Sequence, residues 1–482
     1  MRTCTAPRLP LPTGEIVDRF ALAHTTASPE AVGAFAEAVE AIAAHRPNAA
    51  EALERALQAD PMLVAGHALK GFCGIVLARD EMVATSRDAL MAARFGLADR
   101  AEASADERAL IAALGLAVEG RLRAAADRLE VRLRANPQAL LLVKLVHSLR
   151  FMSGDVVGMR RVGEAILPSW SLGQPGYGYV LGCHAFALEE SGELEAALRV
   201  GREAVEREPR DAWGLHAVAH VYEMTGGTLN GIAWLERTRA GWTGCNNFAF
   251  HLAWHLALFQ LERGLHDRVL DLYDEAVRPR PTDDFRDVAN AASLLWRLRQ
   301  EGEEVDHRWD ELAEIARRRR GETVLVFATL HYLLALVATG DLAAAGDLVC
   351  SLETRAATGM DDQALVASTV GLPMARAILD LARDGPKRAA PELATLVHGL
   401  PQIGGSGAQR DVFVRSLAEL AACKGDLATV RAILALRQQM KREDRFARQL
   451  GIERCRTGLQ HFPGRTTKAR QNLPSPALGS AA

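Results

Sequence analysis

Four histidines lie close together near the middle of the sequence, at spacings that suit one chemical site. The chain has 14 histidines in 482 residues, and four of them fall within the 40 residues that end at His255. They form two pairs, His216 with His220 and His251 with His255, each four residues apart. Residues four apart share one face of an α-helix, so each pair presents two imidazole rings together.

These imidazoles allow three interpretations. Rings from two neighbouring helices can bind a transition metal, or can act as general acid and base near neutral pH. They can also be packed side chains that hydrogen-bond within a core. The pairs lack the HExxH pattern and carry no thiolate at ligand spacing, which counts against a metal. The candidate residues, catalytic or metal-binding, are His216, His220, His251 and His255, with Glu223 and His331 in support.

The elements that must position these residues are predicted by regularly spaced glycines. Glycines that close apolar-periodic stretches recur in steps of 34 to 45 residues, at positions 154, 192, 226, 264, 302, 340, 385 and 425. A helix–turn–helix repeat produces this period, and glycine takes the left-handed conformation that ends a helix. The segments Asn48–Pro61 and Gly192–Pro209 read like second helices of a tetratricopeptide repeat (TPR).

We therefore predict an all-α fold, a right-handed α-solenoid of TPR-like helix–turn–helix repeats, with about 17–20 helices and no sheet. Both histidine pairs precede their closing glycine, which places them on first helices. First helices line the concave surface of such solenoids, so His184, His331 and the four central histidines should share one inner wall.

The two ends of the chain differ from the repeats. Residues 1–28 show no sustained periodicity and are predicted to be irregular, and residues 29–441 form the solenoid. Residues 442–482 are predicted to be a basic and then disordered tail. Its basic part belongs to the stretch from Arg437 to Arg470, which holds ten Lys/Arg against three Asp/Glu.

Composition argues against several classes of protein. The net charge is only −3, so the protein as a whole has no excess of positive charge that would attract a nucleic acid. This argues against a nucleic-acid partner. The sequence has no run of 18 apolar residues that would predict a membrane span, and its start has no apolar signal core. Seven cysteines stand singly without a CxxC, so we expect reduced thiols and a cytoplasmic location.

Two polar connectors lie beside the predicted helices. Asn246 and Asn247 precede the second histidine helix and suit its N-cap; an amide or Cys245 reaching the site is the alternative. The loop GGSGAQRDVF, residues 404–413, precedes a long helix. Such a loop can hold an anion, but it lacks the P-loop Lys-Ser/Thr, and packing against the preceding repeat is the simpler interpretation.

Several strings resemble the tetratricopeptide repeat protein 38 family. They include GHA from Gly66, DAWGLHAVAHVYEM from Asp211, HLAWHLAL from His251, SLLWRL from Ser293, VGLP from Val370 and the loop at 404–413. The resemblance covers about residues 55–440 and implies a single helical-repeat protein. Members of that family usually carry particular polar residues beside these histidines. Here Leu252, Asn290 and the segment Phe327–His331 depart from that pattern.

Two functional hypotheses follow. In the first, the chain is a non-enzymatic or accessory scaffold whose concave groove binds a protein partner or small ligand. In the second, the chain is an enzyme whose acid–base or metal site is the histidine wall, and the cofactor would then be a transition metal. An open groove would favour the first hypothesis. Imidazoles converging within about 5 Å in an enclosed site would favour the second.

Overall fold

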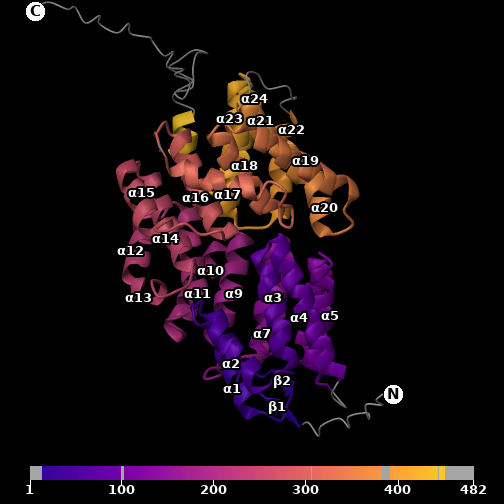
Figure 1. Cartoon of the computed structure of the whole chain (residues 1–482). Helices are drawn as coiled ribbons and strands as arrows, with labels where there is room; N and C mark the ends of the chain where they lie inside the picture. Colours follow the sequence, from indigo (N-terminus) through magenta and orange to yellow (C-terminus); the bar gives the residue numbers. More distant parts are fainter. Residues whose placement is uncertain (1–13, 99–102, 306, 383–390, 443–444, 451–482) are drawn as a thin grey trace, which may run out of the picture.

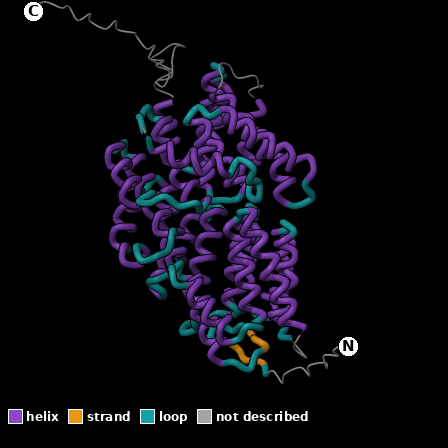
Figure 2. The backbone as a smooth tube through the Cα atoms, viewed as in Figure 1, coloured by secondary structure: helices purple, strands orange, loops and turns teal. Residues whose placement is uncertain are grey.

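The computed structural model describes residues 14–98, 103–305, 307–382, 391–442 and 445–450 of the chain. Helices make up most of this part, and Figure 2 shows strands at one end only. Consecutive helices pack as antiparallel hairpins, and each hairpin stacks on the next. The fold is therefore an all-α solenoid of TPR-like helical repeats.

The first half of the solenoid contains the hairpins that lead to the histidine helices. Its helices are α1 Pro29–Ala43, α2 Ala49–Ala59, α3 Val64–Leu77, α4 Asp80–Ala98, α5 Ala105–Val118, α6 Leu122–Ala135, α7 Leu140–Met152, α8 Val156–Ile166, the 3₁₀ turn η1 Leu167–Ser169, α9 Tyr177–Glu190, α10 Leu194–Arg207, α11 Ala212–Thr225 and α12 Thr228–Arg237.

The second half continues the stack to the C-terminal hairpin. Its helices are α13 Arg239–Trp242, α14 Phe248–Glu262, α15 His266–Leu272, the π turn η2 Tyr273–Val277, α16 Phe285–Gln300, α17 Arg308–Arg318, α18 Val326–Ala338, α19 Leu342–Thr358, α20 Asp362–Val366, the π turn η3 Ala367–Gly371, α21 Leu372–Ala382, α22 Pro391–Gly399, the 3₁₀ turn η4 Leu400–Ile403, α23 Gly407–Cys423 and α24 Leu427–Met440.

The predicted repeat boundaries agree with the backbone. The glycines at 154, 192, 226, 264, 302, 340 and 425 all have positive φ, between 64° and 86°, as a helix-ending turn requires. Gly385 lies outside the described residues. The expected 17–20 helices are too few, since the numbering reaches α24. Short pieces account for the excess, such as α13 and α20, the latter separated from α21 only by a π turn.

The expectation of an irregular N-terminal segment without a sheet is wrong for residues 14–28, and residues 1–13 lie outside the described residues. Strands β1 Glu15–Val17 and β2 Ala23–Thr25 pair antiparallel, with Ile16 opposite His24. The hairpin packs on the start of α5, where Asp106 Oδ2 accepts a hydrogen bond from the N–H of Ala23 at 2.9 Å. Three-residue strands are too short to show alternation in sequence, and the α5 carboxylates that bond β2 lie more than 80 residues away.

The two halves of the solenoid pack against each other. The N–H of Arg123 donates to Asp362 Oδ2 at 2.9 Å, and Arg319 bridges from the α17–α18 connection to Glu81 at 2.8 Å. Figure 1 shows the corresponding orange helices next to the ends of the violet ones. Such long-range contacts enclose the inner faces of the first helices.

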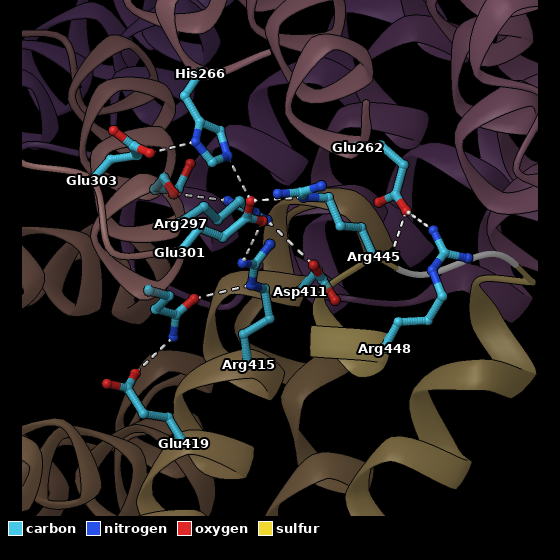
Figure 3. A network of polar contacts seen from close by, with 12 residues as sticks. Glu262, His266, Arg297, Glu301, Glu303, Asp411, Arg415, Glu419, Arg445 and Arg448 are labelled. Carbon is cyan, nitrogen blue, oxygen red and sulfur yellow. Dashed lines mark hydrogen bonds and ion pairs between the residues drawn. The ribbon is translucent and has the colours of Figure 1, made fainter. Parts of the chain in front are cut away.

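Residues 445–450 return to the fold, which corrects the predicted boundary at residue 442, whereas residues 451–482 of the predicted tail lie outside the described residues. Phe446 is 4% exposed, and its ring lies beneath the guanidinium of Arg415 at 4.2 Å. Figure 3 shows Arg445 and Arg448 turned toward Glu301 and Glu262. The basic residues at the start of the predicted tail therefore pair with acidic residues of the same chain.

One helical stretch passes a test for membrane spans. Asp362–Ala382, which comprises α20, η3 and α21, is long and apolar enough by length and composition, although no run of 18 apolar residues predicted it. Within its most apolar window, 56% is buried inside the fold. A buried core helix passes the same test, so this stretch is weak evidence for a span.

Candidate functional site

Helices α11 and α14 carry the two histidine pairs into the interior. Asp211 caps α11 by accepting the N–H of Gly214 at 3.1 Å, and Gly226 ends the helix in the left-handed region. Asn246 Oδ1 accepts the N–H of Phe248 at 3.0 Å at the start of α14, the capping role expected for this connector. Asn247 instead donates to Asp287 at 3.1 Å.

The four central histidines form one buried cluster. Their side chains each offer a nitrogen, and these four nitrogens lie within 4.8 Å of one another. The ring centroids of His216 and His220 are 4.3 Å apart, and those of His220 and His255 are 4.6 Å apart. Exposure is at most 8%, at His251. The rings thus converge in an enclosed site, not along an open groove.

Hydrogen bonds orient two of the rings. His251 Nδ1 lies 2.9 Å from Asn290 Oδ1, and His255 Nδ1 lies 3.0 Å from Glu223 Oε2. Because these oxygens accept, each Nδ1 carries the proton, and each Nε2 turns a lone pair toward the cluster. His216 Nε2 approaches His251 Nε2 at 2.9 Å. A carboxylate or amide behind an imidazole is the usual outer arrangement of a metal-binding histidine.

The histidines are neutral in this environment. Burial lowers the pKa of His216, His251 and His255 well below the ordinary value, and the neighbouring imidazoles lower it further. Burial also lowers the pKa of His220, although Glu190 opposes the shift. Neutral imidazole is the form that binds a metal ion, so the cluster needs no deprotonation to become a ligand set.

The remaining predicted site residues divide into two groups. Glu223 belongs to the cluster through its bond to His255. His331 does not: its Nδ1 donates to the carbonyl of Phe327 at 2.8 Å, and its ring packs on Phe413 at 5.0 Å. Burial lowers the pKa of His331 to about 4. His184 packs against Gly163 on α8 and lies outside the cluster as well.

Two carboxylates beside the cluster were missed by the sequence argument. Glu189 and Glu190 end helix α9, and together with His220 they form a second group of potential ligands within 4.8 Å. Asn290, from α16, was named only for its departure from the family pattern. The two glutamates of α9 and Asn290 of α16 come from different repeats, and no spacing along the chain connects them with the histidine pairs. Only their place on the first helix of a repeat could have indicated an inner position.

The glycine-rich loop at residues 404–413 binds a carboxylate of the same chain. The N–H of Gly407 donates to Glu190 Oε1 at 2.7 Å, and Arg410 pairs with Glu190 Oε2 at 3.0 Å. Ser406 and Gln409 form a capping box at the same helix start. The loop therefore packs within the fold, but against α9, more than 200 residues earlier, and not against the immediately preceding repeat as the simpler interpretation had it. The anion at its N–H group is the carboxylate of Glu190.

No protein-family model matches the chain. Similar solved structures include that of Naa15/Naa10 bound to HypK-THB, with 12% identity, a TM-score of 0.25 and coverage of 88% of this chain and 66% of that chain. Another is the TPR domain of P58(IPK), with 11% identity, a TM-score of 0.20 and coverage of 74% and 90%. On the basis of its own repeated helical hairpins, the chain is a TPR-like helical-repeat protein.

Proposed function

We propose that this chain is a metal-binding member of the tetratricopeptide repeat protein 38 family, in which the four central histidines hold one transition-metal ion. The observation that carries the proposal is the convergence of four buried imidazoles, two of them oriented from behind by Glu223 and Asn290. The strings that resemble the family include both histidine pairs, so the site belongs to the resembling region.

Ligand chemistry narrows the ion to a borderline transition metal. Imidazole suits Zn²⁺, Cu²⁺, Ni²⁺ and Fe²⁺, whereas Ca²⁺ and Mg²⁺ prefer oxygen. In a tetrahedral zinc site the Zn–N distance is about 2.0–2.1 Å, which places nitrogens about 3.4 Å apart. The four nitrogens lie within 4.8 Å, so a small inward movement of the rings completes the shell.

The enclosed site supports the enzyme hypothesis more than groove binding. An ion is small enough to reach imidazoles that are at most 8% exposed, whereas a peptide lying along them is not. Bound there, the ion can polarise a substrate or water if one coordination position opens. We further propose a cytoplasmic location, because the seven cysteines stand singly along the sequence without a CxxC, as expected of reduced thiols.

A scaffold or partner-binding role of the outer repeat surface is the second proposal, and it does not depend on the ion. Solenoids offer long surfaces for protein partners. If a partner is captured equally by protein with and without the ion, the scaffold role is independent of the histidines.

The experiment is metal analysis of purified protein, followed by titration of chelator-treated protein with Zn²⁺, Co²⁺, Cu²⁺ and Ni²⁺. The wild type should bind at least one ion with nitrogen-rich coordination in the Co²⁺ spectrum. The double variant His220→Ala with His255→Ala should lose it and keep its far-UV circular dichroism. His331→Ala, which removes an equally buried imidazole outside the cluster, is the matched control and should retain the ion. A folded double variant that binds as the wild type does would reject the site.

A further inference from the structure

The end of helix α9 brings two adjacent carboxylates into the interior beside the histidine cluster. Glu189 is 5% exposed, and Glu190 is in contact with the start of α23. These carboxylates and His220 offer ligand atoms that all lie within 4.8 Å of one another. Because His220 also belongs to the four-histidine cluster, the two groups are contiguous.

The three carboxylates around the cluster differ in their hydrogen bonding. Glu223 accepts from His255, and Glu190 accepts from Gly407 and Arg410. Glu189 Oε2, in contrast, has no hydrogen-bond partner among the described residues. A buried carboxylate oxygen left without a partner costs free energy, unless a cation or another donor is present.

His220 is the matching unsatisfied group. Both of its ring nitrogens lack a hydrogen-bond partner among the described residues, although the ring is fully buried. Its Nδ1 lies 3.2 Å from Glu189 Oε2, outside hydrogen-bond geometry. This places Nδ1 on the carboxylate side of the ring and leaves Nε2 for the four-histidine side. The arrangement differs from that of His255, whose Nδ1 is hydrogen-bonded to Glu223 at 3.0 Å.

We propose that a second divalent cation binds between α9 and α11, with Glu189, Glu190 and His220 Nδ1 as its protein ligands. It would form a two-metal centre with the ion of the four histidines. The proposal rests on the proposed function through His220, which the two ions share. Binding of both ions to one imidazole displaces its remaining N–H proton to solvent, and the ring becomes an imidazolate bridge.

The charges around the pair favour two ions. In their ionised forms, Glu189, Glu190 and Glu223 would supply three negative charges, and the bridging imidazolate would supply a fourth. These four charges equal the positive charge of two dications. Arg410, paired with Glu190, and Lys441, whose Nζ lies 3.9 Å from Glu223 Oε1, are nearby cations that oppose them. A mixed carboxylate and imidazole set suits Zn²⁺, Mn²⁺ and Fe²⁺, so the second position is less nitrogen-rich than the first.

The test is the number of ions bound per chain. Zn²⁺ and Co²⁺ titrations should saturate at two ions in the wild type and at one in Glu189→Gln, which preserves the shape of the side chain. Glu195→Gln, on the exposed face of α10, is the matched control and should still bind two. In the Cu²⁺-loaded wild type, coupling through the bridge should reduce the electron paramagnetic resonance signal. Glu189→Gln should bind one uncoupled Cu²⁺ per chain, and its electron paramagnetic resonance signal should have the full intensity of one ion.

The outcomes separate the two proposals. A wild type that saturates at one ion, lost in His251→Ala but retained in Glu189→Gln, overturns the second position and leaves the first. Retention of two ions by Glu189→Gln also overturns it. Binding of no ion by the wild type rejects both. Glu189→Ala is a second variant, and circular dichroism and a thermal melt show whether it is folded. If it is folded and binds one ion, the loss of the other ion is due to the missing carboxylate and not to misfolding.

Discussion

At the scale of single residues, two buried aspartates have opposite net pKa shifts, although burial raises the pKa of both. Asp211 is fully buried at the start of α11, and burial raises its pKa to about 7. Burial also opposes ionisation of Asp411, but the nearby guanidinium of Arg437 outweighs it and holds the pKa of Asp411 well below its usual range. The outcome is set by the presence of a close cation, since Arg437 Nε lies 2.5 Å from Asp411 Oδ1.

Asp211→Asn should stabilise the protein at alkaline pH. A raised folded pKa contributes stability below the unfolded pKa of about 3.9, and that contribution is lost as pH rises to about 7. Asparagine keeps the N-cap but cannot ionise. Urea unfolding from pH 4 to 8 should show the variant gaining on the wild type, by at most about 1.4 kcal/mol per pH unit. Equal pH profiles for the two proteins would contradict the raised pKa.

Asp411→Asn should destabilise the protein at neutral pH. The change removes the carboxylate of Asp411 from the buried guanidiniums of Arg437 and Arg297, and loss of one partner of a buried pair costs about 3–5 kcal/mol. Because the folded pKa is depressed, this stabilisation is present above the unfolded pKa and is lost as pH falls through the folded value. The difference between the two proteins should therefore shrink on acidification. A constant difference would show that lost packing, not lost charge, is responsible.

At the scale of elements, helix α24 does not end the folded part of the chain. Phe446 lies near both Arg415 and Arg437, and Arg445 also contacts Glu301. These contacts join the last described segment to α16 and α23. The sequence signalled only excess basic charge here, because the acidic partners lie more than 100 residues earlier.

Phe446→Ala should lower the free energy of unfolding by about 3–5 kcal/mol, the usual cost of removing a buried phenylalanine. Met440→Ala, at a side chain 43% exposed, is the control and should change little. Truncation after Gln460 removes only sequence predicted to be disordered and should shift the melting temperature by less than about 5 °C. The prediction fails if truncation after Gln460 costs as much as Phe446→Ala.

At the scale of the whole molecule, distant repeats are joined in a way that an open solenoid is not. Glu190 from α9 meets the start of α23, and Trp296 on α16 donates to Ser416 on α23 at 3.0 Å. Open repeat arrays gain stability only from neighbours. In this chain, repeats that are far apart in sequence also contact each other. The stability of one half of the solenoid therefore depends on the other half.

We expect α9 and α23 to open together in native-state hydrogen exchange. Their amide protons should exchange with similar free energies, and Glu190→Gln should lower both by a similar amount. An open array would instead show a gradient along the chain, and the variant would affect only the helices beside it. Helix α2, which packs mainly against α1 and is remote from both α9 and α23, provides the internal reference.

The sequence could predict the repeats and the four histidines because both depend on local spacing. Glycine at each helix end and histidine at i and i+4 are visible within one or two helices. Glu189, Asn290 and the β1–β2 hairpin depend on which repeats meet, and that is decided by packing over long sequence separations. The predicted grouping of His331 with the cluster failed for the same reason, since membership of a first helix does not fix the direction of the side chain.

The contact between Glu190 and the start of α23 has a consequence for biosynthesis. Translation delivers α9, α11 and α14 well before α23 and the segment around Phe446 leave the ribosome. During that interval the imidazoles have their own helices but not the later repeats that enclose them. The ion that we propose could therefore enter the nascent chain before the interior closes, and its exchange after synthesis would require those late helices to detach.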